Sequence, residues 1–247
     1  MFKIRIAGLT AELDNRYAYV TDQCRDYTVS DHDATDLVAN ATREQILREL
    51  SAEGSPKDEG YAESVCLYRS IAEQLYAYDA FLMHGAVIGF EGKAYAFLAS
   101  SGTGKSTHIR LWRKHLKDGV IPVNGDKPVL RFENGILTAY GTPWAGKEGW
   151  QRNLGLPLAG ICLLTRGEVN SLERVDPTMA LSRLMRQIYL PKSSDGAIAT
   201  MALIDRMADQ IPIYRLACNM TEDAVKTSFE GMTGLSYTEA KGRYNEN

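Results

Sequence analysis

The stretch that decides the fold reads Ala94-Tyr-Ala-Phe-Leu-Ala-Ser-Ser-Gly-Thr-Gly-Lys-Ser-Thr107. Its first six residues are an apolar run that predicts a buried strand. The glycine-rich part that follows leads into a helix predicted over Gly104–Lys117, where Ile109, Trp112 and Leu116 share one face. A strand, such a loop and a helix in this order are typical of a phosphate-binding loop.

Each residue type of the loop suits an anion. Gly102 and Gly104 let the main chain approach a phosphate with no Cβ in the way, and the helix N-terminus attracts negative charge. Lys105 can reach β- and γ-phosphates, and Ser106 places a hydroxyl where Mg²⁺ is expected. The general pattern of such loops has glycine where this chain has Ala99. We expect a nucleotide to contact these residues: Ser101, Gly102, Thr103, Gly104, Lys105, Ser106 and Thr107.

Outward from the loop, strand and helix signals alternate without regularity. Strands are predicted at Phe2–Ala7, Tyr17–Thr21, Ala86–Phe90, Ala94–Ala99, Val120–Val123, Val129–Phe132, Leu158–Leu164 and Ile213–Ala217. Helices are predicted at Ala41–Leu50, Glu59–Asp79, Gly104–Lys117, Met179–Tyr189, Ala197–Gln210 and Glu222–Gly231. A hairpin, with Glu91-Gly-Lys93 as its turn, leads into the loop, so we predict a mixed α/β fold and not a purely parallel doubly wound sheet.

Three parts of the chain differ in character. Residues 1–80 predict a small α+β lobe that either stands alone or belongs to the same domain as the rest, with a loop at Ala52–Gly60. Residues 81–235 contain the phosphate loop and predict the core of the molecule. Residues 236–247 are polar, and we expect them to be a frayed tail.

Composition narrows the class of function. A net charge of −3 over 247 residues, with no concentrated basic face in the sequence, argues against a nucleic-acid partner. No apolar run is long enough to span a membrane, and Met1–Ile6 does not begin a signal peptide, so we expect no membrane association and a cytoplasmic protein. The four cysteines show no metal-ligand spacing, and we expect them to be reduced thiols. The four histidines form no metal-binding pattern either.

Three short segments resemble a known family. Ser101–Thr107 looks like the phosphate loop of HPr kinase/phosphorylase and of ATP-dependent phosphoenolpyruvate carboxykinase. Met83-His-Gly-Ala-Val-Ile88 is similar to the His-Gly segment that precedes this loop in HPr kinases, and Asn124-Gly-Asp126 falls where those kinases have paired aspartates. The resemblance spans about Met83 to Gly231.

The chain also looks like a group of HPr-kinase-related proteins found beside peptide-maturation genes. The segments that carry this second resemblance are Tyr140–Lys147, Pro157-Leu158 and Cys218–Met220. Two features depart from full HPr kinases: Gly125 replaces one of the two aspartates, and the N-terminal part does not look like their regulatory domain.

The resemblance implies an HPr kinase-like core, a homo-oligomer, and an ATP- and Mg²⁺-dependent kinase acting on a hydroxyl. The acceptor would be a serine of a peptide or small protein, or a small metabolite such as free serine. Ser106 and Asp126 would hold the metal, Lys105 would hold phosphates, and Asp126 or His84 would take the hydroxyl proton. Two alternatives stay open: an ATP-binding partner protein without transfer activity in a peptide-maturation system, and a nucleotide hydrolase.

Other side chains have a functional and an ordinary interpretation. Cations near the end of a helix can stabilise a transferring phosphoryl group or simply complement the helix dipole. We favour the dipole for Arg183 and leave Arg186 and Lys192 open. The remaining candidates are Lys147 and Arg152 as phosphate or substrate contacts, Trp144 and Trp150 as pocket walls or packing, and Cys218 and Met220 as core or adenine neighbours.

Overall fold

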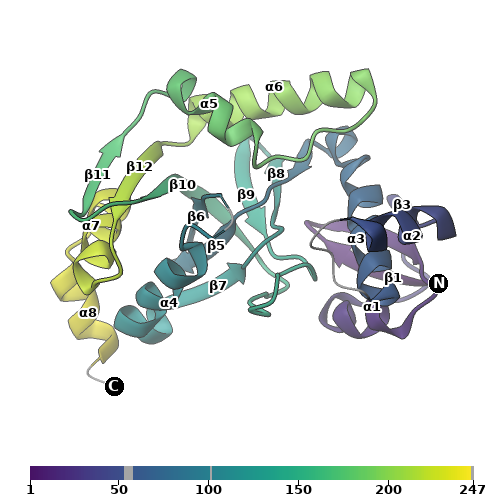
Figure 1. The fold of residues 1–247 in the computed structure, drawn as a ribbon, viewed down its shortest axis with the longest axis horizontal. Helices are drawn as coiled ribbons and strands as arrows, with labels where there is room; N and C mark the ends of the chain where they lie inside the picture. The colour runs from purple at the N-terminus through teal and green to yellow at the C-terminus, as the bar shows by residue number, and fades with distance from the viewer. Residues whose placement is uncertain (53–57, 101, 246–247) are drawn as a thin grey trace.

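The computed structural model describes residues 1–52, 58–100 and 102–245. Two sheets organise these residues: a three-stranded sheet near the N-terminus and a nine-stranded mixed sheet that forms the rest of the molecule. Figure 1 shows the small sheet with α1–α3 on one side of the molecule and α7 and α8 at the opposite end. The fold is therefore mixed α/β with helices flanking a mixed sheet, as predicted.

The N-terminal lobe is a hairpin extended by one parallel strand. β1 (Phe2–Ile6) pairs antiparallel with β2 (Leu9–Asp14), which pairs parallel with β3 (Leu37–Asn40). The helices of the lobe are α1 (Ala18–Gln23), η1 (Arg25–Tyr27), α2 (Arg43–Ser51), α3 (Glu59–Ala72) and η2 (Leu75–Tyr78). The loop predicted at Ala52–Gly60 lies largely outside the described residues.

The strand predicted at Tyr17–Thr21 is wrong, because this segment begins α1. Both carboxylate oxygens of the fully buried Glu63 accept main-chain N–H bonds, at 2.8 Å from Arg16 and at 3.0 Å from Tyr17. A helix start leaves such donors without partners in its own turn. A tertiary contact 46 residues away thus overrides the local β propensity.

The large sheet runs in the order β4-β8-β9-β10-β6-β5-β7, and β12 extends it from β10 and carries β11. Its strands are β4 (Ala80–Leu82), β5 (Ala86–Phe90), β6 (Lys93–Leu98), β7 (Val120–Asn124), β8 (Val129–Glu133), β9 (Ile136–Tyr140), β10 (Gly155–Arg166), β11 (Ser171–Arg174) and β12 (Ile213–Cys218). The remaining helices are α4 (Lys105–Leu116), η3 (Lys117–Gly119), α5 (Pro177–Met185), α6 (Ser194–Gln210), α7 (Glu222–Thr233) and α8 (Tyr237–Asn245).

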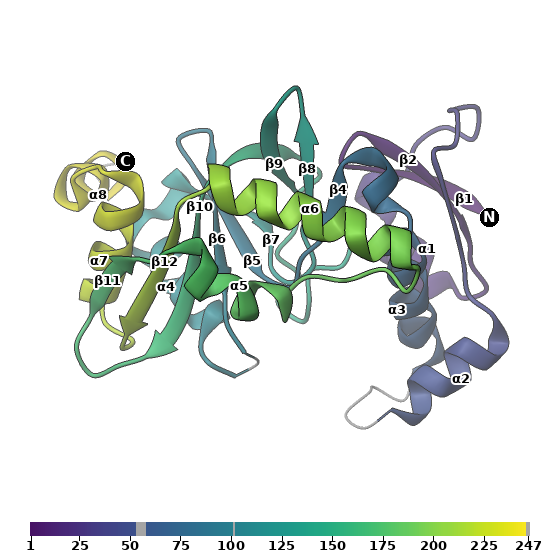
Figure 2. The same cartoon turned by 90° about the horizontal axis from the view of Figure 1, so that it is seen from above.

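Strand β6 shows how the two faces of this sheet are covered. Ala94, Ala96 and Leu98 pack in the cluster that contains α5 and α6, whereas Tyr95 and Phe97 pack with α4, α7 and α8. This alternation follows from the two-residue period of a strand. Figure 2 shows α6 lying along the sheet, with α5 at one of its ends.

Three strands place their carboxyl ends together. β10 pairs parallel with β6 on one side and with β12 on the other, while the other described pairs of the large sheet are antiparallel. The ends of β6, β10 and β12 therefore meet at one edge. Ligands of α/β proteins bind in such crevices.

Several short elements were missed from the sequence: strands β2, β3, β4, β9 and β11, and helix α8. The turn before β9 is Asn134-Gly135, whose φ angles of 51° and 87° suit a tight hairpin. β11 is short and largely exposed. The polar tail expected at residues 236–247 is instead helix α8 as far as Asn245, because Tyr237 and Ala240 are 4% exposed and pack into the core.

Candidate functional site

The loop that the sequence predicts to bind phosphate joins β6 to α4, so the predicted order of strand, loop and helix is confirmed. Gly102 and Gly104 have φ angles of 76° and 122°, which L side chains rarely adopt, and a Cβ at either would meet no atom within 4 Å. The glycines are therefore required for conformation and not for space. Nζ of Lys105 donates to the carbonyl of Ala99 at 2.7 Å, which folds the lysine back over its own loop. Ser101 lies outside the described residues.

The electrostatics of Lys105 place Asp126 and Lys127 near the loop. Burial lowers the pKa of the Lys105 ammonium below its ordinary value, the charge of Asp126 opposes that shift, and Lys127 adds to it. The lysine is half-buried, so these neighbouring charges are weakly screened. Lys105 and Asp126, which the sequence places in one site, therefore share a neighbourhood.

Asp126 lies between two cations or potential cations. Its Oδ1 is 3.1 Å from Nε2 of His84, and its Oδ2 accepts from Nζ of Lys127 at 2.9 Å. Burial works to raise the pKa of the carboxyl, but the hydrogen bonds and charges of His84 and Lys127 outweigh it, so the net shift is downward. Asp126 is thus held as a carboxylate at neutral pH.

The main chain fixes this cluster. Asn124 is 1% exposed, and its Oδ1 accepts the N–H groups of Asp126 at 2.9 Å and Lys127 at 2.7 Å, while its Nδ2 donates to the Thr142 carbonyl at 3.0 Å. The N–H of Gly85 donates to the Asp126 carbonyl at 2.9 Å. The turn after β7 and the start of β5 are therefore joined, which sets Asp126 opposite His84.

Gly125 leaves no room for a second carboxylate. A Cβ at this position would lie 2.7 Å from the main-chain carbonyl oxygen of Ala145, and main chain cannot move aside as a flexible side chain can. The contact with the Ala145 carbonyl therefore explains why glycine, and not a second aspartate, occupies position 125.

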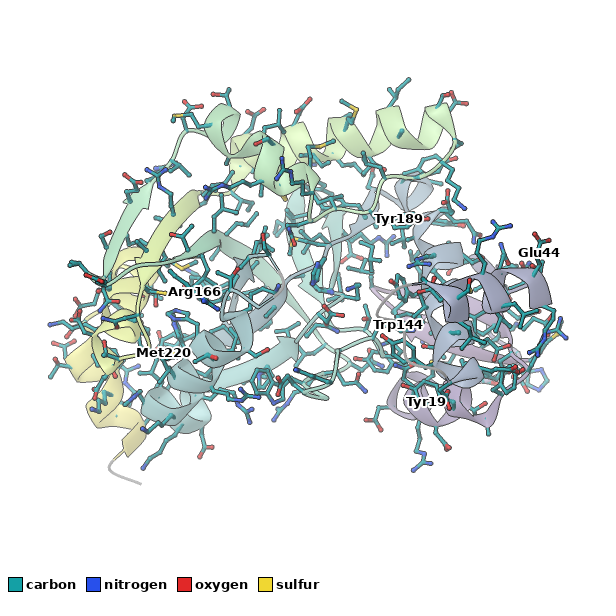
Figure 3. The ribbon with its side chains drawn as sticks, viewed as in Figure 1. Tyr19, Glu44, Trp144, Arg166, Tyr189 and Met220 are labelled. Atoms are coloured by element: carbon teal, nitrogen blue, oxygen red, sulfur yellow. The ribbon has the colours of Figure 1, made fainter. Side chains whose placement is uncertain are left out.

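A cavity of about 780 Å³ adjoins one side of the phosphate loop. Arg166, Arg183, Arg186 and Gln187 line it with loop residues that include Ser100 and Gly102. Arg166 was missed from the sequence, although it ends the apolar strand β10 beside the loop. Its Nη2 donates to the Gly102 carbonyl at 2.7 Å, which braces the loop from β10. Figure 3 labels Arg166 near Met220, toward the α7 and α8 end of the molecule.

A second cavity, of about 430 Å³, also adjoins the loop. It is mainly apolar, and its walls include Thr107, His108, Leu111, Leu164 and the end of β12 with Cys218, Asn219 and Met220. Cys218 is half-buried there, and Met220 is 76% exposed at the rim and so is not a core residue. Arg166 lines both cavities.

His108 brings an unpaired ring nitrogen to the wall of the second cavity. Burial lowers its pKa to about 4, so the ring is neutral. Its Nε2 lies 3.0 Å from Oγ of Ser228 and 3.1 Å from the indole nitrogen of Trp112, and the indole N–H also donates to Oγ of Ser228 at 2.9 Å, so Nε2 has a partner in either tautomer. Nδ1 is buried and has no hydrogen-bond partner among the described residues. A buried ring nitrogen without a partner is costly unless a ligand satisfies it.

Of the remaining cationic candidates, Arg183 and Arg186 line the first cavity, whereas Lys147 and Arg152 are exposed and do not line it. Lys192 does not line it either, and its main-chain N–H donates to Oε2 of Glu73 at 2.9 Å.

Trp144 and Trp150 pack against neighbouring side chains and line neither of these two cavities. Arg110 and Arg113 lie over the ring of Trp150, at 5.5 and 5.2 Å from its centroid. Trp144 is buried against the N-terminal lobe, where its Nε1–H donates to Ser64 Oγ at 2.9 Å and Tyr68 packs on its edge. Figure 3 shows Trp144 on the side that faces this lobe.

Two expected absences can be compared with the structure. Within residues 1–52, 58–100 and 102–245, no group of three or more His, Cys, Asp or Glu side chains could hold a metal ion. No helix in the same residues is long and apolar enough to cross a membrane.

Comparison with known proteins gives little. No protein-family model and no curated protein matches the chain. Among solved structures, the chain is similar to the Hpr(Ser) kinase/phosphatase from Coxiella burnetii, with 11% identity, a TM-score of 0.36, and coverage of 67% of this chain and 99% of that one. This is a distant likeness to an HPr kinase fold and says nothing of a shared substrate.

Proposed function

We propose that the protein is an ATP- and Mg²⁺-dependent kinase that phosphorylates a hydroxyl group. The observation that carries this proposal is the His84–Asp126 pair, 3.1 Å apart, in the electrostatic neighbourhood of Lys105 in the phosphate loop. A phosphate-binding loop supplies the donor side of the reaction, and a carboxylate–imidazole pair beside it supplies a proton acceptor.

The donor's phosphates would lie on the main-chain amides of the loop and on Lys105. The Ser106 hydroxyl and the Asp126 carboxylate are hard oxygen donors of the type that Mg²⁺ prefers, and the absence of a larger acidic cluster in the described residues fits an ion that phosphates and waters also coordinate. Mg²⁺ supplies neutralisation of the charge that develops on the phosphate oxygens.

The acceptor hydroxyl would attack the γ-phosphorus in line. Its oxygen forms the new P–O bond, the bond from the γ-phosphorus to the β–γ bridging oxygen breaks, and ADP leaves with that electron pair. The lowered pKa makes Asp126 a weak base. We assign the proton to Nδ1 of His84, with Asp126 orienting the ring through Nε2.

The nucleoside would occupy the second cavity. The apolar walls of this cavity suit a base, and Nδ1 of His108 offers a hydrogen bond to one of its polar atoms. This agrees with the second of the two interpretations of Cys218 and Met220, as core residues or as adenine neighbours.

Transfer of radiolabel from γ-labelled ATP to peptide and metabolite hydroxyls tests the proposal. We expect transfer by the natural protein, with Asp126→Asn and His84→Gln each losing at least about a hundredfold. Because only the proton acceptor is lost, the affinity of His84→Gln for ATP should stay within about twofold of that of the natural protein. Transfer that is unaffected by either substitution would contradict the assignment.

One observation favours the second candidate, an ATP-binding partner protein without transfer activity. Gly125 is closed to a second carboxylate by the Ala145 carbonyl, so the site has fewer acidic groups than the kinases it resembles. Tight ATP binding with no transfer to any acceptor would support this candidate. Rapid release of inorganic phosphate without an acceptor would instead support the hydrolase.

A further inference from the structure

The first cavity has an unbalanced charge. Three guanidinium groups, those of Arg166, Arg183 and Arg186, line it, and no acidic side chain is among its described lining residues. The Arg166 guanidinium already has a partner, because its Nη2 donates to the carbonyl of Gly102 at 2.7 Å. Neither Arg183 nor Arg186 forms a side-chain hydrogen bond or an ion pair with any residue that the structure describes.

Helix α5 aims these two groups at the same place. Arg183 lies in its last turn and Arg186 is its C-cap residue, so the two are three positions apart and share one face. Complementing the helix dipole accounts for one cation at this end, but not for a pair directed into a cavity. Two adjacent guanidiniums are suited to bidentate bonds with a carboxylate or a phosphate.

The main chain connects this pair to the proposed proton acceptor. The carbonyl of Gln187, the residue after Arg186, accepts the N–H of His84 at 2.6 Å. The next residue, Ile188, bridges antiparallel to Met83. The cavity is thus bounded by the phosphate loop on one side and, through Gln187, by the segment that carries His84 on the other.

Gln187 adds a second unused group. Its Oε1 is buried and has no hydrogen-bond partner among the described residues, and the residue lines the same cavity. An acceptor molecule with an N–H or O–H group would satisfy it.

We propose that Arg183 and Arg186 bind an anionic group, a carboxylate or a phosphate, which the acceptor carries close to the hydroxyl that becomes phosphorylated. This inference rests on the proposed function, since it names the substrate class of that site. The anion itself forms and breaks no covalent bond. It places the hydroxyl between the γ-phosphate and His84.

Compounds matched with and without the anionic group distinguish the sources of the anion. The pairs are L-serine and L-serinamide, a peptide that ends in serine as free acid and as amide, and glycerol 3-phosphate and glycerol. Calorimetry would measure their binding with and without Mg²⁺ and a non-hydrolysable ATP analogue. At least one acid should bind about ten times more tightly than its counterpart without the anionic group, and the pair that does so identifies the anion. No preference in any pair would overturn the proposal.

The variant Arg183→Gln/Arg186→Gln tests the residues themselves. Both side chains are exposed, so we expect the variant to fold, which thermal unfolding would check. The preference for the acid should fall to within about twofold, while affinity for the ATP analogue stays unchanged. Arg174→Gln, which removes an exposed guanidinium on β11, should keep the preference.

Two results would contradict the assignment. One is an acid preference that survives in the double variant. The other is a loss of analogue affinity as large as the loss of acid affinity, which would make the pair a nucleotide site. A protein that transfers no phosphoryl group but loses its acid preference with the two arginines would refute the proposed function and leave only the anion site at Arg183 and Arg186 standing.

Discussion

His84 and Asp126 are joined twice. Their side chains meet at 3.1 Å between Nε2 and Oδ1, and the main-chain N–H of Gly85, next to His84, donates to the Asp126 carbonyl at 2.9 Å. The second bond holds the two main-chain segments together independently of the side-chain rotamers. The proposed proton acceptor and the carboxylate that orients it are thus close together before any substrate binds.

The lowered pKa of Asp126 makes a prediction about acid stability. A folded pKa below the unfolded value means that the carboxylate stabilises the folded state above about pH 4, and that this contribution is lost as the pH falls through the folded pKa. Urea unfolding of the natural protein and Asp126→Asn should therefore differ most at neutral pH and converge as the pH falls below about 4. A difference that grows on acidification would contradict the assignment.

Gly125 should tolerate no side chain. Gly125→Ala is expected to cost about 1–3 kcal/mol of unfolding free energy, because its Cβ would overlap the Ala145 carbonyl. Gly125→Asp should not increase transfer. Gly242→Ala is the control, since a methyl group at this position in α8 would meet no atom within 4 Å and should stabilise slightly. Equal stability of the two alanine variants would show that the Gly125 contact relaxes freely.

His108→Phe should weaken nucleoside binding selectively. The substitution removes Nδ1 while keeping a ring against Phe97, whose centroid lies 5.2 Å away. Loss of one hydrogen bond is worth about 0.5–1.5 kcal/mol, or roughly 2- to 12-fold in the Kd of ATP. Inorganic tripolyphosphate, which lacks the base, should bind both proteins equally. An equal loss for both ligands would move His108 out of the nucleoside site.

Trp144 should couple the N-terminal lobe to the site. Its side chain packs on α3, and its main-chain carbonyl accepts the Lys127 N–H at 3.1 Å. Trp144→Ala is expected to lower the unfolding free energy by about 3–5 kcal/mol. Trp150→Ala, at a half-buried position, should cost far less. Similar losses in both variants would argue against a special role for the Trp144 contact.

The sequence was most informative where local patterns decide structure. The phosphate loop, the hairpin before it and most helices follow from glycine placement and apolar periodicity. His84, Lys105 and Asp126 could be named as candidate site residues because they lie in or beside recognisable motifs. The structure brings Asp126 to His84 and into the neighbourhood of Lys105.

What the sequence missed depends on contacts between distant residues. α1 was taken for a strand because nothing local reveals that Glu63 binds the amides before it. Arg166 carries no motif, and only the parallel pairing of β10 with β6 brings it to the loop. The sequence does not reveal that Arg183 lines the first cavity, because segments that lie far apart along the chain form this cavity.

The claim on which the account depends most is that the loop before α4 binds ATP through Lys105. Calorimetry with Mg-ATP on the natural protein, on Lys105→Ala and on the control Lys93→Ala, whose side chain is exposed in the hairpin before the loop, measures this directly. The account predicts that Lys93→Ala binds like the natural protein and that Lys105→Ala loses at least about tenfold in affinity. Equal affinity of all three proteins would contradict it.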